Sequence, residues 1–416
     1  MNIIKLHALP PSDFIGNSIF SNPVPTNTPF LADKDSGKVI EPVLHFILAQ
    51  TKVSNSNEAR CDDLKDWFIY LDAFELNWLD ANDEDLDQYQ EIMESTVSSR
   101  NEPYSKATIK RRTTSIVQFY RYWKRKGVYK HDIEEIRESN CHLPSNDNAL
   151  AHLGNGKAIE SSAYDRLGSA KKSPPKVFTP KEWQAFSPKL GPQTNAHRLI
   201  WEVALQTGAR IHEVLKLTKY DIQALVTDPT LPYVTQPILC SGKGGKDRNL
   251  LFPNWLIDTL NEYILNERAN AVNNARKKHK KYKEPAELFL TLDHTKFAGS
   301  AVSQRTALRH FNKAVIAAGY IIPRIKINPD TGETYYVHIA KYTGHCTRHS
   351  FAVWTYYSRK EQGDSEPWKF IQIRLGHESV RTTQKTYLKA TDEFEARISD
   401  TVFKDLREKA LGGVTL

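Results

Sequence analysis

The chain has 416 residues, more than a single domain usually contains, so we expect about two to three domains, each with its own core. Its net charge of +8 at pH 7 favours a polyanionic partner, either nucleic acid or an acidic membrane surface. No stretch is apolar and long enough to span a bilayer or to form a signal peptide, and the four cysteines are too scattered for a disulfide framework or a zinc site. We therefore expect a cytoplasmic protein in a reducing compartment.

The start of the chain is rich in Pro, Asn and Ser and shows no apolar period, so residues 1–40 are predicted to form a flexible extension. From Glu41 onward, apolar side chains recur at helical spacing, and Pro42 suits the first position of a helix. Residues 41–135 are therefore predicted to form an all-helical domain. The apolar positions that carry this prediction are Val43, Leu44, Phe46, Ile47, Leu48, Leu64, Trp67, Phe68, Leu71, Leu86, Tyr89, Met93, Ile109, Ile116, Phe119, Tyr120 and Trp123.

The last predicted helix of this domain starts near Ser105, ends before Gly127 and mixes basic with aromatic residues. Such a helix can lie along DNA, where each Lys or Arg that contacts a phosphate adds affinity that does not depend on base sequence. A solvated basic face would have the same composition, so both interpretations stay open. The candidate DNA-binding residues are Lys110, Arg111, Arg112, Lys124 and Arg125.

Residues 136–177 have the composition of a linker, with several glycines and a K-K-S-P-P-K run near the end. Such a basic linker either follows a phosphate backbone or is simply solvated. The next domain begins with a capping box, in which Thr179 precedes Pro180 and Glu182 follows three residues after the threonine. A further helix ends in T-G-A-R, where Gly208 suits the position just after a helix C-terminus.

Two predicted strands, residues 233–240 and 248–252, flank the glycine-rich sequence S-G-K-G-G-K-D and should form a hairpin. Residues 255–265 return to helical spacing. The basic run R-K-K-H-K-K-Y-K at residues 276–283 is either a solvated face or a surface that contacts DNA. A later helix is expected to begin at an H-x-x-R sequence, and a polar loop is expected over residues 358–367.

Four signals carry the chemistry, and they follow one order along the chain. Arg210 lies in T-G-A-R-I-H-E, and Lys243 lies in S-G-K-G-G-K-D-R. His345 and Arg348 form the H-x-x-R pair, and an L-G-H sequence precedes Tyr387. Each signal alone is weak, because H-x-x-R pairs are common on helix surfaces and G-K-G-G-K lacks the full pattern of a nucleotide-binding P-loop.

Together, in this order and after a helical domain with an F-Y-x-x-W run, the four signals resemble the tyrosine recombinase, or phage-type integrase, family. The resemblance covers the chain from about residue 41 to its end. It implies a mainly α-helical fold with a small antiparallel β-sheet, in which the all-helical core-binding domain and a mixed α/β catalytic domain over residues 178–392 form a clamp around DNA. The last segment, residues 393–416, is expected to be a helix that packs on its own domain or docks on a neighbouring protomer.

Tyrosine attack on a DNA phosphodiester places negative charge on the non-bridging oxygens, which two guanidinium groups can hold. Arg210 and Arg348 are the candidates for these groups. The phenol of Tyr387, the candidate nucleophile, has an ordinary pKa of about 10 and needs a base or a positive field to ionise. His345 is the candidate general acid or base, and His377 is a second donor to the phosphate.

The resemblance also implies a lysine that protonates the leaving 5′ oxygen. This residue is Lys243, with Lys246 as the second choice. Glu213, one turn after Arg210, either orients a catalytic side chain or forms an ordinary helix ion pair. The sequence departs from the family pattern at Thr347, where an apolar residue is common, and in the spacing from L-G-H to the tyrosine, which is one residue longer than the commonest spacing.

Because arginine, lysine and histidine supply the electrostatic stabilisation, the resemblance implies catalysis without a metal ion and without ATP. The expected function is site-specific recombination through a covalent 3′-phosphotyrosyl intermediate, for integration or excision of a mobile element. The expected partners are double-stranded DNA attachment sites, further copies of the chain in a homo-tetramer on DNA, and accessory DNA-bending proteins. The expected location is the nucleoid, and no membrane partner is expected. The alternatives are a catalytically inactive DNA-binding protein of the same fold and an enzyme similar to type IB topoisomerases.

Overall fold

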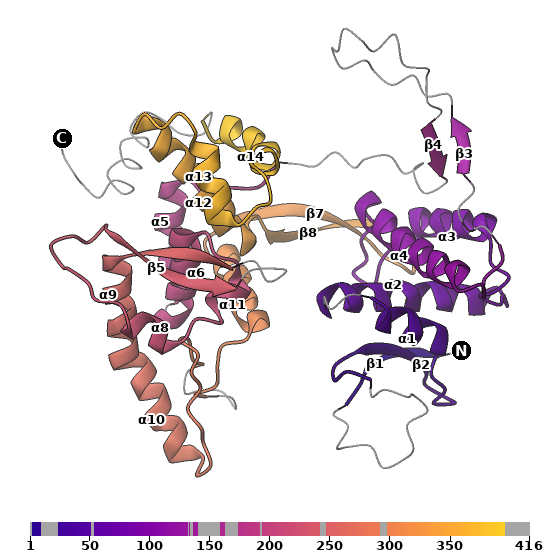
Figure 1. The fold of residues 1–416 in the computed structure, drawn as a ribbon, viewed down its shortest axis with the longest axis horizontal. Helices are drawn as coiled ribbons and strands as arrows, with labels where there is room; N and C mark the ends of the chain where they lie inside the picture. Colours follow the sequence, from indigo (N-terminus) through magenta and orange to yellow (C-terminus); the bar gives the residue numbers. More distant parts are fainter. Residues whose placement is uncertain are drawn as a thin grey trace, which may run out of the picture. The chain divides into compact units, whose positions relative to one another are not determined.

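The computed structural model describes residues 2–9, 24–50, 54–131, 133, 136–139, 159–162, 174–191, 194–241, 247–291 and 298–395. The chain divides into two compact units. The first comprises Met1–Lys171 with Ile325–Tyr336, and the second comprises Lys172–Arg324 with Val337–Leu416. Along the sequence, the first division falls inside the predicted linker, and most elements of each unit are labelled in Figure 1.

The first unit opens with a two-stranded antiparallel sheet of β1 (Ile3–His7) and β2 (Pro29–Asp33). Ile3 and Leu31 are buried in the core of the unit, at 3% and 0% exposure. The expectation of a flexible extension over residues 1–40 did not foresee this sheet, because each strand is short and its partner is distant in the sequence. Residues 10–23 lie outside the described part of the chain.

The helices of the first unit are α1 (Glu41–Leu48), α2 (Ser54–Ala73), α3 (Asp83–Ser95) and α4 (Lys106–Arg125). They bury the apolar stripes that the sequence predicts, with Trp67 and Tyr120 at 0% and 1% exposure. The indole nitrogen of Trp67 donates a hydrogen bond to the Tyr120 hydroxyl at 3.1 Å, which satisfies a polar group inside the core. A capping box between Asn82 and Asp85 starts α3. These elements confirm the helical prediction for this segment.

The segment predicted as a linker contains a second strand pair, β3 (Ile136–Ser139) with β4 (Ile159–Ser162), in antiparallel register. The linker prediction rested on glycine and proline content and included no strand, so the structure differs from it here. Residues 140–158 and 163–173 lie outside the described part of the chain.

The second unit begins with α5 (Pro180–Phe186), the 3₁₀ turn η4 (Ser187–Leu190), α6 (Asn195–Thr207), α7 (Ile211–Val214) and α8 (Lys219–Gln223). Thr179 and Glu182 form the predicted capping box at the start of α5. Several residues of α6, among them the fully buried Trp201, lie in the core of the unit. Because α6 is packed in the core, it fixes the position of the chain that follows its C-terminus.

The predicted hairpin consists of β5 (Thr235–Ser241) and β6 (Asp247–Pro253), which pair antiparallel. Its tip, residues 242–246, lies outside the described residues. After the hairpin follow α9 (Asn254–Tyr263), the π-helical turn η5 (Ile264–Arg268) and α10 (Ala269–Lys278). At the end of α10, Arg276 of the basic run forms an ion pair with Glu284 at 3.0 Å, so this arginine contacts its own unit.

The chain continues with α11 (Gln304–Ala317), β7 (Ile321–Ile327), β8 (Thr334–Ala340), α12 (His345–Glu361), α13 (Pro367–Leu375) and α14 (Val380–Glu395). The tip of the β7–β8 hairpin groups with the first unit. α12 begins at the H-x-x-R sequence as predicted, but it continues to Glu361. The loop expected over residues 358–367 is therefore shorter than predicted, because Arg, Lys and Glu at its start favour helix.

α14 carries both Tyr387 and Phe394, so the predicted boundary between residues 392 and 393 falls inside one helix. Phe394 is 1% exposed, and its ring centroid lies 5.6 Å from that of Tyr357 in a core of the same unit. In its described part, this helix therefore packs on its own unit. Residues 396–416 lie outside the described part, and docking on a neighbouring protomer stays a prediction.

Candidate active site

The end of α6 places the first predicted arginine. Gly208 there has a φ of 66°, in the left-handed region that favours glycine, and a Cβ would lie 2.5 Å from the Phe351 ring. After this turn, Arg210 is the N-cap residue of α7. Its backbone N–H donates to Glu213 Oε2 at 2.6 Å, and its Nη1 donates to Oε1 at 3.2 Å. One carboxylate thus holds both ends of Arg210, and 24% of its side chain stays exposed.

Glu213 is buried, at 1% exposure, and has a second arginine partner. Arg248 on β6 donates from Nη1 to Oε1 at 2.9 Å and from Nη2 to Oε2 at 2.6 Å. Burial alone would raise the pKa of Glu213, but the hydrogen bonds from Arg248 and Arg210 and the charges of both arginines lower it below its ordinary value. The carboxylate is therefore ionised at neutral pH. Sequence analysis missed Arg248, although it ends the S-G-K-G-G-K-D-R motif.

Arg348 on α12 is 2% exposed. Its Nη1 donates to the Gly208 carbonyl at 2.6 Å, and its Nη2 donates to the Leu375 carbonyl. These acceptors carry no formal charge, and burial followed by the nearby charge of Arg210 lowers the pKa of Arg348 to about 9. An anion that binds beside both arginines would offset their mutual repulsion, so the site favours a negatively charged group.

Two predicted histidines lie close to these arginines. Nδ1 of His377 lies 2.9 Å from Oγ1 of Thr383, within hydrogen-bond distance. Burial, followed by the charges of Arg348 and Arg210, lowers the pKa of His377 to about 4. The pKa of His345, the first residue of α12, is lowered by desolvation and by the same two charges. Both imidazoles are therefore neutral at neutral pH, and each has one N–H to donate.

Tyr387 on α14 is 1% exposed, and its hydroxyl oxygen lies 3.0 Å from Nδ1 of His349, the residue after Arg348. Burial raises the pKa of this phenol to about 12, although the charges of Arg348 and Arg210 act to lower it. The rings of His377 and Tyr387 are nearly parallel, at 7°, with centroids 6.3 Å apart. The longer spacing between these two residues in the sequence therefore does not keep them apart.

The second unit brings together all the predicted catalytic residues that the structure describes, namely Arg210, His345, Arg348, His377 and Tyr387. Lys243 and Lys246 belong to the hairpin tip, which lies outside the described residues. The structure adds His349, which the sequence analysis missed. A signal was available, because His349 follows His345 by four positions and thus shares its helix face, and the two ring centroids lie 4.5 Å apart.

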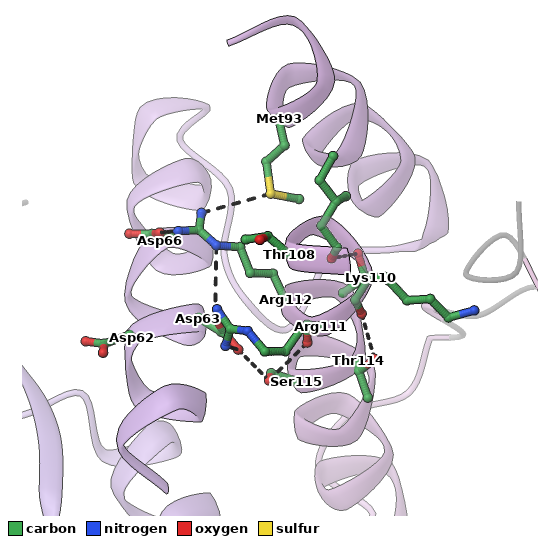
Figure 2. Close-up of polar contacts among 12 residues, drawn as sticks. Asp62, Asp63, Asp66, Met93, Thr108, Lys110, Arg111, Arg112, Thr114 and Ser115 are labelled. Carbon is green, nitrogen blue, oxygen red and sulfur yellow. Dashed lines mark hydrogen bonds and ion pairs between the residues drawn. The ribbon is translucent and has the colours of Figure 1, made fainter. Parts of the chain in front are cut away.

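The predicted DNA-binding residues lie on α4 in the first unit. Nη1 of Arg111 lies 2.5 Å from a carboxylate oxygen of Asp63, and Nη2 of Arg112 lies 2.6 Å from one of Asp66. Figure 2 shows both arginines beside the α2 aspartates, whereas the Lys110 side chain extends away from α2. Contact with DNA stays a prediction for all five residues. The exposed members at the last turn of α4 are Lys124 and Arg125.

The described part of the chain contains neither a membrane-spanning helix nor a cluster of metal ligands. None of its helices is both long and apolar enough to cross a membrane. Its residues form no group of three or more His, Cys, Asp or Glu side chains placed to hold a metal ion. The side chains that converge in the second unit are instead arginines, histidines and a tyrosine.

A tyrosine beside two arginines and two neutral histidines, in a mainly helical unit with a small β-hairpin, defines a class of enzyme that transfers DNA strands through tyrosine. The chain belongs to the phage integrase family, whose model matches residues 178–393. The match runs from just before α5 to residue 393 within α14 and includes every residue of the site described above. The predicted family and fold class are confirmed, and the chain is a site-specific recombinase of the integrase type.

Solved structures of recombinases resemble this chain at low sequence identity. The XerH site-specific recombinase, bound to a palindromic difH substrate in a post-cleavage complex, is 18% identical, with a TM-score of 0.50 and 88% of each chain covered. The Tn1549 transposon integrase in complex with circular intermediate DNA is 15% identical, with a TM-score of 0.47, covering 83% of this chain and 94% of that one. A lambda integrase dimer bound to a COC′ core site is 13% identical, with a TM-score of 0.48, covering 82% and 91%. No curated protein sequence matches the chain.

Proposed function

We propose that this recombinase cleaves and rejoins double-stranded DNA at its attachment sites through Tyr387, with a covalent 3′-phosphotyrosyl intermediate. The observation that carries the proposal is that Arg348 and Arg210 lie close enough to the buried phenol for their charges to act on it. The phenol oxygen attacks the phosphorus while the two arginines hold the non-bridging oxygens and stabilise the developing charge. His345 is the candidate general acid or base beside the phosphate, and His377 donates a further hydrogen bond to it.

The leaving 5′ oxygen takes a proton from Lys243 in this proposal. The new phosphotyrosyl bond conserves the free energy of the phosphodiester, so a second strand can be joined by the reverse reaction without ATP. Arginine and histidine side chains supply the stabilisation that a metal ion provides in other phosphoryl transfers, so no divalent metal is needed. Full activity in a chelating buffer without nucleotide is the expected result, and loss of strand cleavage on chelation would contradict it.

The biological reaction is integration or excision of a mobile element, carried out by a homo-tetramer on paired attachment sites with accessory DNA-bending proteins, in the nucleoid of the cytoplasm. Membership of the phage integrase family supports this part of the proposal. A monomeric enzyme similar to type IB topoisomerases would relax supercoiled DNA without exchanging strands. Recombinant products from two attachment sites on separate DNA molecules therefore distinguish the two functions.

Covalent trapping tests the nucleophile. The substrate is a nicked duplex taken from the DNA that flanks the gene, on which cleavage releases a short strand and leaves the protein attached. The wild type should form an adduct that survives denaturing electrophoresis, and Tyr387→Phe should form none. Tyr356→Phe is the matched control, because this tyrosine stacks on Trp368 outside the site, with ring centroids 4.3 Å apart. An adduct with Tyr387→Phe would mean another nucleophile, and no adduct with any variant would favour an inactive DNA-binding protein.

A modified leaving group tests the general acid. Lys243→Ala should cleave ordinary DNA about a hundredfold or more slowly, within the usual contribution of acid catalysis. A substrate with sulfur in place of the leaving 5′ oxygen should restore the rate, since a thiolate leaves without a proton. Lys246→Ala is the control and should cleave both substrates at nearly the wild-type rate. If the sulfur substrate restores the rate of Lys246→Ala and not that of Lys243→Ala, then Lys246 is the general acid.

A further inference from the structure

The hydroxyl of Tyr387 makes one hydrogen-bond contact among the described residues, and the partner is His349. The two residues meet between α12 and α14, with Oη 3.0 Å from Nδ1, ring centroids 5.5 Å apart and 65° between the ring planes. Tyr387 is 1% exposed, so solvent does not reach its hydroxyl freely. The immediate surroundings of the candidate nucleophile are therefore set by this imidazole.

The burial of Tyr387 and the contact with His349 together indicate which atom carries the hydrogen. The pKa of Tyr387 is raised by burial to about 12, so its oxygen is protonated at neutral pH. A buried O–H that finds no acceptor is strongly unfavourable, and Nδ1 of His349 is the acceptor within reach. His349 must therefore be the tautomer with hydrogen on Nε2 and a lone pair on Nδ1. This lone pair points at the proton that the nucleophile has to lose.

We propose that His349 is a catalytic residue whose Nδ1 accepts the phenolic proton of Tyr387 as the oxygen attacks DNA. The inference rests on the proposed function of Tyr387 as nucleophile. The O–H bond of the tyrosine breaks and an N–H bond forms on the imidazole, while a P–O bond forms to the tyrosine and the bond from phosphorus to the 5′ oxygen breaks. That oxygen takes a proton from Lys243. In the joining step the imidazolium returns its proton to the departing phenolate, so one residue serves both directions.

Cationic and neutral groups surround His349. They are His345 and Arg348 on its own helix, His377 before α14 and Tyr387 on α14. Burial, followed by His345, Arg348 and His377, lowers the pKa of His349 to about 3, so the imidazole is a neutral acceptor at every physiological pH. The transition state adds negative charge at the phosphorus, and this charge stabilises the imidazolium that forms beside it. The same charge raises the proton affinity of the imidazole, so proton transfer is easier with a phosphate in the site than without one.

The experiment measures single-turnover cleavage of the nicked flanking-DNA duplex by the full chain, from pH 7 to pH 9. His349→Phe keeps a ring of similar size and removes the acceptor nitrogen. Its rate at pH 7 should fall about 10² to 10⁴-fold, the usual contribution of a general base, with unchanged DNA binding. The loss should shrink about tenfold for each unit of pH, because without the imidazole the phenol must ionise before it attacks, and its ionised fraction rises about tenfold for each unit of pH below its pKa. His310→Phe on α11, outside the site, is the matched control and should keep the wild-type rate at each pH.

His349→Asn separates proton transfer from positioning. Its Oδ1 can accept the same hydrogen bond but cannot be protonated near neutral pH, so this variant should stay as slow and as dependent on pH as His349→Phe. Recovery of most of the wild-type rate in His349→Asn would overturn the proposal, because it would show that positioning of Tyr387 is sufficient. A rate for His349→Phe within threefold of the wild type, or a loss that is constant with pH, would also overturn it.

The same assay distinguishes the inference from the function on which it rests. If Tyr387→Phe still traps an adduct, the nucleophile is wrong whatever the His349 variants do. If Tyr387→Phe is inactive and His349→Phe is fully active, only the role of His349 fails. If His349→Phe unfolds at the assay temperature, the dependence of the His349→Asn rate on pH decides alone.

Discussion

Arg210 is positioned by a buried carboxylate that a second arginine keeps ionised. Glu213 accepts two hydrogen bonds from Arg248 and two from Arg210, so it joins the β5–β6 hairpin, near the start of β6, to α7. A Cβ on Gly376, in the L-G-H turn, would lie 3.2 Å from Cδ of Arg248. Arg248 is thus packed between the hairpin and the turn that carries His377. We therefore expect Arg248 to hold other groups in place rather than to contact the phosphate.

Arg248→Ala should lower the rate of covalent cleavage about tenfold or more, because it leaves a buried carboxylate with Arg210 as its remaining partner. A double-mutant cycle with Glu213→Ala tests whether the effect passes through Glu213. If it does, the double variant should cleave no more slowly than Glu213→Ala alone, since removing both charges leaves neither unpaired. Additive losses would show that Arg248 acts on the site by another route. Lys369→Ala, at an exposed ion pair with Glu366 in the same unit, is the control and should leave cleavage unchanged.

The motifs predicted the catalytic candidates because each lies in a short sequence with its own spacing, as Arg210 does in T-G-A-R-I-H-E. They did not predict Arg248 or His349. Arg248 meets Glu213 across 35 residues of sequence, and His349 meets Tyr387 across 38. Pairs this distant form only when the elements pack. The local spacing places His349 on the helix face of His345, but it does not indicate that His349 meets Tyr387 or that Arg248 meets Glu213.

At the scale of elements, the contact between α2 and α4 divides the basic face of α4 into two parts. Asp63 on α2 is 1% exposed and accepts from Arg111 and from the Ser115 hydroxyl, the latter at 2.7 Å. Burial raises its pKa above the ordinary value, although the hydroxyl and the arginine act to lower it. Arg112 pairs with Asp66 and covers the Tyr104 ring, 4.7 Å from its centroid. Part of the face predicted for DNA thus stabilises the helix pair.

Two alanine variants of α4 should therefore show different defects, one in stability and the other in DNA binding. Arg112→Ala should lower the unfolding free energy of the first unit by about 1 to 3 kcal/mol, because a mostly buried cation and its packing are lost. Arg125→Ala, at the exposed last turn, should leave stability within about 0.5 kcal/mol and reduce the slope of log affinity against log salt by about 1. Urea unfolding and DNA binding at several salt concentrations measure both. Equal loss of stability in the two variants would contradict this division.

Local signals predicted several element boundaries of the fold. The capping box at Thr179 starts α5, and Gly208 ends α6. The β1–β2 sheet and the β3–β4 pair were missed because a short strand is stabilised by its partner rather than by its own sequence. Boundaries that a single residue determines are therefore predictable, and pairings between distant segments are not.

At the scale of the whole molecule, the second unit buries histidines that must stay neutral. Burial is the first cause of the low pKa of His197, His349 and His377, which lie at about 4, about 3 and about 4. In the unfolded chain each has a pKa of about 6.5. The unfolded state therefore binds more protons below this value, and the unfolding free energy falls as the pH drops from about 6.5 toward the folded pKa values. Acid should destabilise this unit before its carboxylates titrate.

His197 allows this dependence on pH to be tested away from the catalytic residues. It stacks on His310, with ring centroids 3.9 Å apart, and its neutral form is favoured by burial and by the charges of His310 and Arg309 on α11. His197→Phe keeps the stack and removes the titration, so its stability should fall between pH 7.5 and pH 5 by about 2 kcal/mol less than that of the wild type.

Urea unfolding followed by circular dichroism and by the tryptophan fluorescence of the chain, to which the buried Trp201 on the same helix as His197 contributes, measures this difference at the two pH values. His279→Phe, at an exposed position of the same unit, is the matched control and should lose as much stability on acidification as the wild type. If His197→Phe also loses as much, the acid sensitivity comes from other groups. A smaller loss in His197→Phe alone would assign about 2 kcal/mol of the dependence to this buried imidazole, because its protonation is unfavourable only in the folded unit.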